Sequence, residues 1–164
     1  MKLPACELNR LCASSSVIRL ALIAATLMLS ATTISTNVSA HSYKVGEIAV
    51  GHIWAPPPTE DADGLPIYGA ILNNGNEAAR LRAASVSVAN DVKFRRIDGD
   101  IVSWPADIVF LPNKPLALAP WREHIWIAGL RRPISEGDTF ELSLDFGPSG
   151  QLTVTVIVEP NEGH

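Results

Sequence analysis

The sequence predicts an all-β protein, a sandwich of two antiparallel sheets, and three observations lead to this fold class. Apolar and polar residues alternate with a period of two in several segments, most clearly in residues 140–146, where four apolar side chains alternate with three polar ones. No helical period persists for more than one or two turns. Prolines, which lack the backbone donor that a sheet needs, recur between the segments. Many short strands divided in this way are typical of a two-sheet sandwich.

The first 40 residues are expected to form a signal peptide that is cleaved on export to the periplasm. Basic residues at the start are followed by an apolar run, residues 20–29, and Val38 and Ala40 are the small residues that a signal peptidase requires. A bilayer span takes about 20 apolar residues, so this run is too short to remain as a membrane anchor, which is the alternative. The mature protein is expected to be a single domain, residues 41–158, with a disordered tail, residues 159–164.

Every sulfur-containing residue lies in this leader: Met1, Cys6, Cys12 and Met28. Cleavage would therefore leave a domain without thiols, disulfides or thioethers, which must be stable through core packing alone. Cys12 precedes the apolar run instead of standing at the cleavage point, so lipid attachment is not expected. The remaining acidic residues outnumber the basic ones and are scattered, which argues against binding to nucleic acid or to an anionic membrane.

The strands of the mature domain are predicted from alternation and from the position of turns. The last two, residues 140–146 and 152–158, form a hairpin across the turn at 147–150. Asp98-Gly99-Asp100 lacks the further oxygen ligands of a calcium loop and is interpreted as a hairpin turn. Residues 55–64, with three prolines and three acids, are expected to be a mobile loop. The other predicted strands are residues 48–54, 67–73, 81–88, 92–97, 108–111 and 123–128.

Four segments of the mature chain resemble the periplasmic copper chaperone family called PCu(A)C. The most specific one is 124–138, which is similar to the family's metal-binding His-x-Met followed by Gly-Leu-Lys/Arg-x-Pro-Leu-x-x-Gly-Asp. The other three are Gly51-His52-Ile53-Trp54-Ala55, residues 68–74 and the closing hairpin. Together they span about residues 45–158, nearly all of the expected mature chain.

The resemblance implies a cupredoxin-like β-sandwich and a role in handling and delivering copper. In the family a Cu(I) ion is bound by a His, a Met and the His-x-Met pair, because neutral thioethers suit a cuprous ion and release it readily. The cofactor or cargo implied is therefore copper. The partner implied is a periplasmic copper-transfer or oxidase-assembly protein.

This chain departs from the family at the copper ligands. The family spacing, counted back from His124, places the upstream pair at Val102 and Asp91, whereas local similarity places it near Ser103 and Arg95. Neither alignment supplies a histidine or a methionine. Only His124 remains of the four ligands.

Trp126 stands where the family has the last methionine. Two arginines, Arg95 and Arg96, lie beside the expected site and would repel a cation. The Cu(I) site is therefore expected to be largely lost.

Three histidines remain as weak candidate metal ligands: His124, His52 and His41. His124 is either a remnant ligand, completed by another protein, or an inert histidine at a strand end. His52 lies in a strand without a second ligand at i+2 or i+4, so a structural role is favoured. Cleavage after Ala40 would give His41 an α-amino group beside its imidazole, a pair that can chelate Cu(II) as in a histidine brace.

The sequence leaves two main hypotheses for function. The first is a copper chaperone-family protein with weak copper binding, and the alternative is a metal-free periplasmic interaction module. The module would use a tryptophan-rich loop end, since four tryptophans are more than one sandwich core normally absorbs: Trp54, Trp104, Trp121 and Trp126. No nucleophile elbow, Cys–His pair, phosphate loop or HExxH motif occurs, so an enzyme is not expected.

Overall fold

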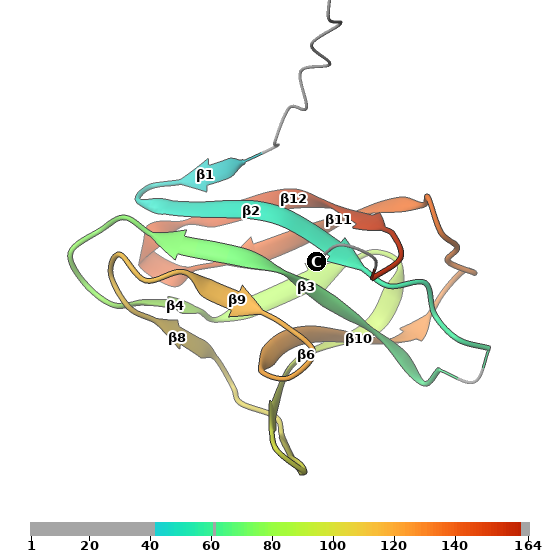
Figure 1. Ribbon diagram of the computed structural model, residues 1–164. Helices are drawn as coiled ribbons and strands as arrows, with labels where there is room; N and C mark the ends of the chain where they lie inside the picture. The colour runs from blue at the N-terminus through green and yellow to red at the C-terminus, as the bar shows by residue number, and fades with distance from the viewer. Residues whose placement is uncertain (1–41, 61, 162–164) are drawn as a thin grey trace, which may run out of the picture. The chain divides into compact units, whose positions relative to one another are not determined.

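The structure, a computed structural model, describes residues 42–60 and 62–161. It is almost entirely β, which confirms the predicted fold class (Figure 1). A single 3-10 turn, Gly147–Ser149, joins the last two strands. The strands, in chain order, are β1 (Tyr43–Val45), β2 (Ile48–Ala55), β3 (Gly64–Asn73), β4 (Ala79–Leu81), β5 (Ala83–Val86), β6 (Ala89–Asp98), β7 (Ile101–Ser103), β8 (Ile108–Phe110), β9 (Leu116–Leu118), β10 (Glu123–Leu130), β11 (Thr139–Asp145) and β12 (Gln151–Val158).

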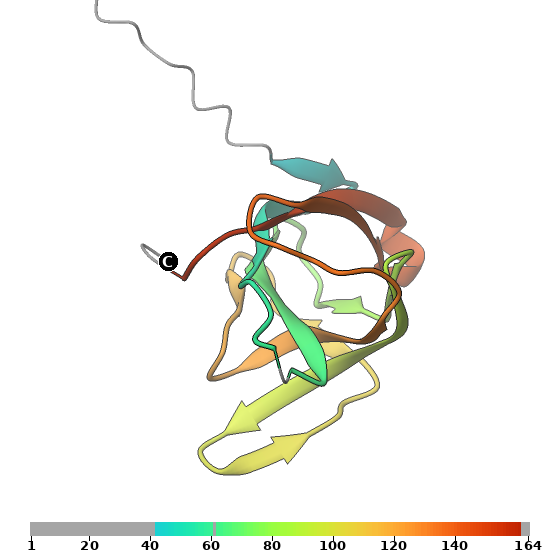
Figure 2. The ribbon, with the colours of Figure 1, turned by 90° about the vertical axis from the view of Figure 1, so that its right-hand side faces the viewer.

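The two sheets of the sandwich share strand β3. Its first half pairs with β10, where Leu65 lies opposite Ile127, and its second half pairs with β2 and β9, where Gly69 lies opposite Leu118. The order of strands along this path is β5-β11-β12-β2-β3-β10-β6-β7. Figure 2 shows the strands surrounding a common interior.

The prediction of antiparallel pairing holds with one exception. β12 runs parallel to β2, with Val156 opposite Ile53, while the other paired strands are antiparallel. A parallel pair needs a long connection, and here the whole domain lies between the two strands.

The core is built from the alternating residues of these strands. In the predicted closing hairpin, β11 and β12 pair antiparallel, and Phe140, Leu142 and Leu144 are buried, as is Phe146 just beyond the strand. Each such side chain contributes about 1.5–3 kcal/mol on burial. No disulfide is needed for a core of this kind.

Several predicted strand boundaries are wrong. The predicted strand 81–88 is two strands in different sheets, because the Arg82 backbone amide turns to donate to the Asp145 carbonyl at 2.8 Å. β3 begins at Gly64, before the predicted start. The sequence also missed β1, β7 and β9, three-residue strands too short to show alternation.

The β6–β7 hairpin projects from the body of the domain (Figures 1 and 2). Asp98 pairs with Ile101, so the predicted hairpin turn at 98–100 is confirmed. Gly99 has a φ of +58°, a left-handed conformation that glycine adopts without strain. This hairpin lies beside β10, the strand that carries His124.

Candidate functional site

His124 lies on the outer face of β10 and is nevertheless buried. Its neighbours Ile125 and Ile127 point into the core, and the period of two places His124 on the other side with Trp126. The ring is only 1 % exposed, and its Nδ1 donates a hydrogen bond to the Arg122 carbonyl at 3.1 Å. Burial lowers the pKa of His124, and the nearby Arg95 charge lowers it further. The imidazole is therefore neutral at neutral pH.

Aromatic rings enclose this imidazole. Tyr68 lies edge-on to it with the ring centroids 5.5 Å apart, and the centroid of the Trp126 ring is 6.4 Å from that of His124. Trp54 continues the row, 5.0 Å from the Tyr68 ring. Burial raises the pKa of Tyr68, and Arg95 opposes this effect. The row is thus an apolar cover over the strand face that holds His124.

Arg95 lies directly opposite His124 on the neighbouring strand β6. Its guanidinium carbon lies 4.7 Å from the centroid of the Trp126 ring and 5.8 Å from that of Trp104. These are cation–π distances, and a pair of this kind contributes about 0.5–1 kcal/mol at an exposed site. A fixed positive charge therefore occupies the space beside His124.

These residues do not fit a copper ion. His124 uses one ring nitrogen for the Arg122 carbonyl, Trp126 offers no donor in place of a thioether, and Arg95 is a permanent cation. Among residues 42–60 and 62–161, no three His, Cys, Asp or Glu side chains are grouped so that they could hold a metal. The position at which the family resemblance implies a copper site carries an organic cation, the Arg95 guanidinium.

Of the alternative ligand positions, only Arg95 comes opposite His124. Asp91 lies opposite Ala128, farther along β10, and Val102 and Ser103 are on β7 and pair with β6. The structure therefore brings no second oxygen, nitrogen or sulfur ligand of that set to His124.

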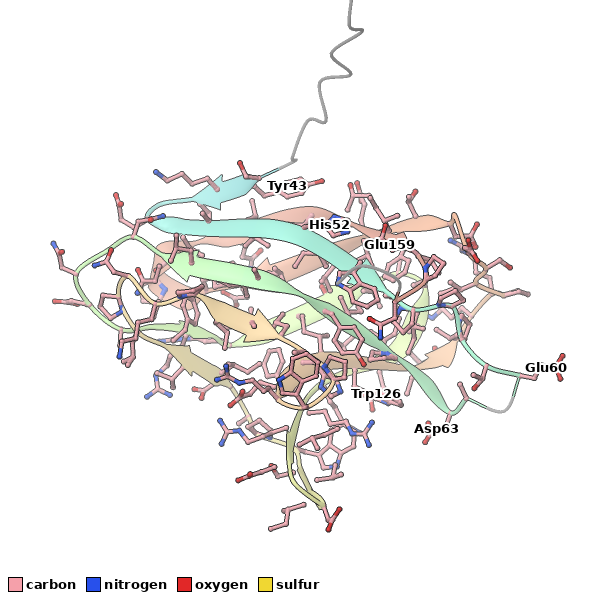
Figure 3. The ribbon with its side chains drawn as sticks, in the orientation of Figure 1. Tyr43, His52, Glu60, Asp63, Trp126 and Glu159 are labelled. Carbon is pink, nitrogen blue, oxygen red and sulfur yellow. The ribbon has the colours of Figure 1, made fainter. Side chains whose placement is uncertain are left out.

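The second candidate histidine, His52, does not join His124. His52 is on β2, close to the irregularity between β2 and β3, and its Nε2 contacts the Glu159 carboxylate. Figure 3 shows these two residues together and apart from Trp126. His41, with the leader and its cysteines, lies outside the described residues, so the expected signal peptide and histidine brace remain predictions.

An apolar groove of about 330 Å³ lies beside the aromatic row. It is lined by Trp54 and Tyr68, by Leu118 at the end of β9, and by Pro120 and Trp121 from the loop before β10. Trp121 is 69 % exposed at its edge. The predicted surplus of tryptophans thus divides into buried Trp54, partly buried Trp126 and two exposed rings, Trp104 and Trp121.

The sequence model of the LpqE-like lipoprotein family matches residues 48–158. The chain belongs to this family. Family membership fits an exported protein, and within residues 42–60 and 62–161 there is no helix capable of spanning a bilayer. No curated protein matches the LpqE-like chain in sequence.

Solved structures confirm the resemblance to PCu(A)C domains at the level of the fold. The apo PCuAC domain from PmoF1 is 20% identical, covers 73% of this chain and 99% of its own, and has a TM-score of 0.66. The copper-bound PCuAC domain from PmoF2 is 24% identical, covers 73% of this chain and 98% of its own, and has a TM-score of 0.65. The solution structure of CuI-DR1885 from Deinococcus radiodurans is 16% identical, covers 78% of this chain and 87% of its own, and has a TM-score of 0.61.

The buried histidine of this LpqE-like domain predicts a specific pH dependence. The folded state holds His124 with a pKa below the ordinary value of 6.5, so below pH 6.5 the unfolded chain binds more protons than the folded one. The free energy of unfolding should therefore fall with acidification below 6.5, by up to about 1.4 kcal/mol per pH unit, until the folded pKa is passed. Urea unfolding curves recorded at several pH values between 7.5 and 5 measure this change in the free energy of unfolding.

His124→Gln should lose this part of the pH dependence, while His52→Gln should keep it. The difference between wild type and His124→Gln isolates the histidine from the carboxylates. A wild-type domain that gains stability on acidification relative to His124→Gln would show that the buried ring is protonated instead.

Proposed function

We propose that this protein is an exported, non-enzymatic member of the copper-handling proteins that acts by binding a partner protein. The proposed partner is a periplasmic copper-transfer or oxidase-assembly protein. The fold is shared with a copper-bound PCuAC domain and with CuI-DR1885, which supports a place in copper handling. The contact surface would be the outer face around Arg95, Trp104 and Trp126, and copper would not be held at His124.

One observation carries this proposal: the Arg95 guanidinium stacked against Trp104 and Trp126 opposite His124. Near a protein surface, the repulsion between this guanidinium and a metal cation a few ångströms away amounts to several kcal/mol. An indole that replaces a thioether removes the soft ligand that favours Cu(I). Indole and guanidinium groups are also the side chains most often found at the centres of protein interfaces.

Copper titration of the protein purified after export tests the proposal. In competition with a chromophoric Cu(I) chelator, the wild-type protein should withdraw no Cu(I) through His124, and His124→Ala should behave as wild type. Stoichiometric Cu(I) binding that His124→Ala abolishes would contradict the proposal.

A Cu(II) titration then tests the remaining histidine hypothesis. Cu(II) binding that is lost when one residue is added ahead of His41 would assign copper to the amino terminus. Such a site would place copper on this protein without involving the Arg95 face.

A further inference from the structure

Arg95 is a cation without a counter-ion. Among residues 42–60 and 62–161, the Arg95 side chain makes neither a hydrogen bond nor an ion pair. Its charged group makes cation–π contacts with the two indole rings. Its Nε is enclosed without an acceptor, whereas its two terminal nitrogens are not enclosed in this way. The guanidinium is thus held in place with donors free to bind a ligand.

Three acids lie on β6 and β10: Asp98 is on the opposite face of β6 from Arg95, and the other two are already paired. Asp91 accepts from Lys93 at 2.6 Å, and Glu123 accepts from Arg96 at 2.7 Å. Neither is left to neutralise Arg95. A carboxylate for this guanidinium therefore has to come from outside these strands.

Stacking prepares the guanidinium for a carboxylate. The planar group donates in its own plane, where two N–H groups match the two oxygens of a carboxylate. Rings on either side restrict its rotation, so less side-chain entropy is lost on binding.

Toward β7 the neighbours of Arg95 on this face are apolar, whereas toward the start of β6 they are the Lys93–Asp91 ion pair. Val102 lies opposite Ile97 on the β6–β7 hairpin, and Val102 and Trp104 are 45 % and 51 % exposed. β7 is the last strand of the path, so this apolar surface lies at an open edge of the sheet. Arginine and tryptophan are both enriched at interface hot spots, where the surrounding contacts exclude water.

We propose that Arg95 binds an aspartate or glutamate side chain of the partner protein, on a segment whose neighbouring residues are apolar and pack against Trp104 and Val102. This inference rests on the proposed function and names the chemistry of its partner. The position that corresponds to a metal site in the fold would then select an anion.

NMR signals of the Arg95 side chain and of the tryptophan indole N–H groups, recorded on the full exported protein, report ligand binding at this site. The probes are sodium acetate and the capped tripeptides Ac-Val-Glu-Val-NH2 and Ac-Val-Gln-Val-NH2. We expect the glutamate tripeptide to shift the Arg95 Nε–H and the Trp104 and Trp126 indole N–H signals in a saturable way, at least tenfold more tightly than the glutamine tripeptide. Acetate should shift the Arg95 signal alone and bind more weakly.

Two substitutions of Arg95 distinguish the effect of its positive charge from that of its planar pair of N–H donors. Arg95→Gln should abolish the effect at both indoles, and Arg95→Lys should weaken it because a point charge lacks the planar fork. Arg80→Gln, which changes an exposed arginine on β4 that is already paired with Asp107, is the matched control and should bind as wild type. Thermal unfolding of each variant confirms that it is folded.

Equal binding of the two tripeptides would overturn the carboxylate assignment, and acetate binding as tight as that of the glutamate tripeptide would overturn the role of the apolar surface. If the protein binds neither Cu(I) nor the glutamate tripeptide, this inference is overturned and the proposed function is not. Cu(I) bound through His124 would overturn the proposed function itself.

Discussion

Replacing Arg95 and Trp126 together by methionine is expected to convert the domain into a Cu(I)-binding protein. Arg95 is directly opposite His124 across β6 and β10, and Trp126 is two residues along the same face, so both new thioethers would converge on the imidazole. The exchange removes a fixed positive charge and adds two soft, neutral ligands. We expect Cu(I) affinity to rise at least about a thousandfold over wild type, or about 4 kcal/mol. Competition with a chromophoric chelator under reducing conditions measures it.

The matched control is the double variant Arg95→Leu and Trp126→Leu, which opens the same space without sulfur. Adding His124→Ala to the methionine pair should remove most of the gained affinity, because two thioethers alone make a poor site. If the leucine and methionine pairs competed equally for copper, the position would not be a displaced metal site, and the argument from Arg95 would fail.

Much of the fold follows from local patterning. Residues 140–146 and 152–158 alternate so regularly that their pairing and their buried face are fixed by the sequence, and the structure has both. The turn at 98–100 could also be placed, since Asp-Gly-Asp allows few other conformations. The parallel contact of β12 with β2 could not be foreseen, because it depends on the path of the whole chain and not on either strand.

The site was only partly accessible to sequence reasoning. That His124 lacks the other copper ligands of the family it resembles was visible in the residues, but the arginine beside it, held between two indoles, was not, because Arg95 lies on β6 and Trp104 follows β7. The predicted turn contained the missing signal. Since Asp98 pairs with Ile101 and Arg96 with Ser103, continuing the register brings Trp104 opposite Arg95. A hairpin drawn from that turn would have shown the stack.

The burial of His124 was also unexpected for an outward-facing residue. It depends on Tyr68 and Trp126, which come from two strands and meet over one ring. Gly64 allows this, because a Cβ at that position would lie 2.5 Å from the Trp126 Nε1. No pattern within a single strand reveals such a cover.

Gly69→Ala is expected to destabilise the domain strongly, by about 3 kcal/mol or more. Gly69 has a φ of +151°, which is strained for other residues, and it lies where β3 passes from one sheet to the other. A Cβ there would lie 2.4 Å from the Ile53 Cδ1 and 2.6 Å from the His52 carbonyl oxygen. The isoleucine can rotate, but the carbonyl belongs to the backbone of β2 and cannot move without disturbing the sheet. Urea unfolding at constant pH measures the loss.

Gly51→Ala is the matched control for this prediction. A Cβ at Gly51 would meet the Ala70 carbonyl oxygen at 3.7 Å and the Ala70 Cβ at 3.9 Å, which are ordinary contacts in the same pair of strands. Its free energy of unfolding should stay within about 1 kcal/mol of wild type. Equal stability of the two variants would show that β3 does not require glycine at the bend. If the bend is required, Gly69→Ala should also displace Tyr68 from His124, because the strand that carries the phenol ring would have to shift to relieve the clash.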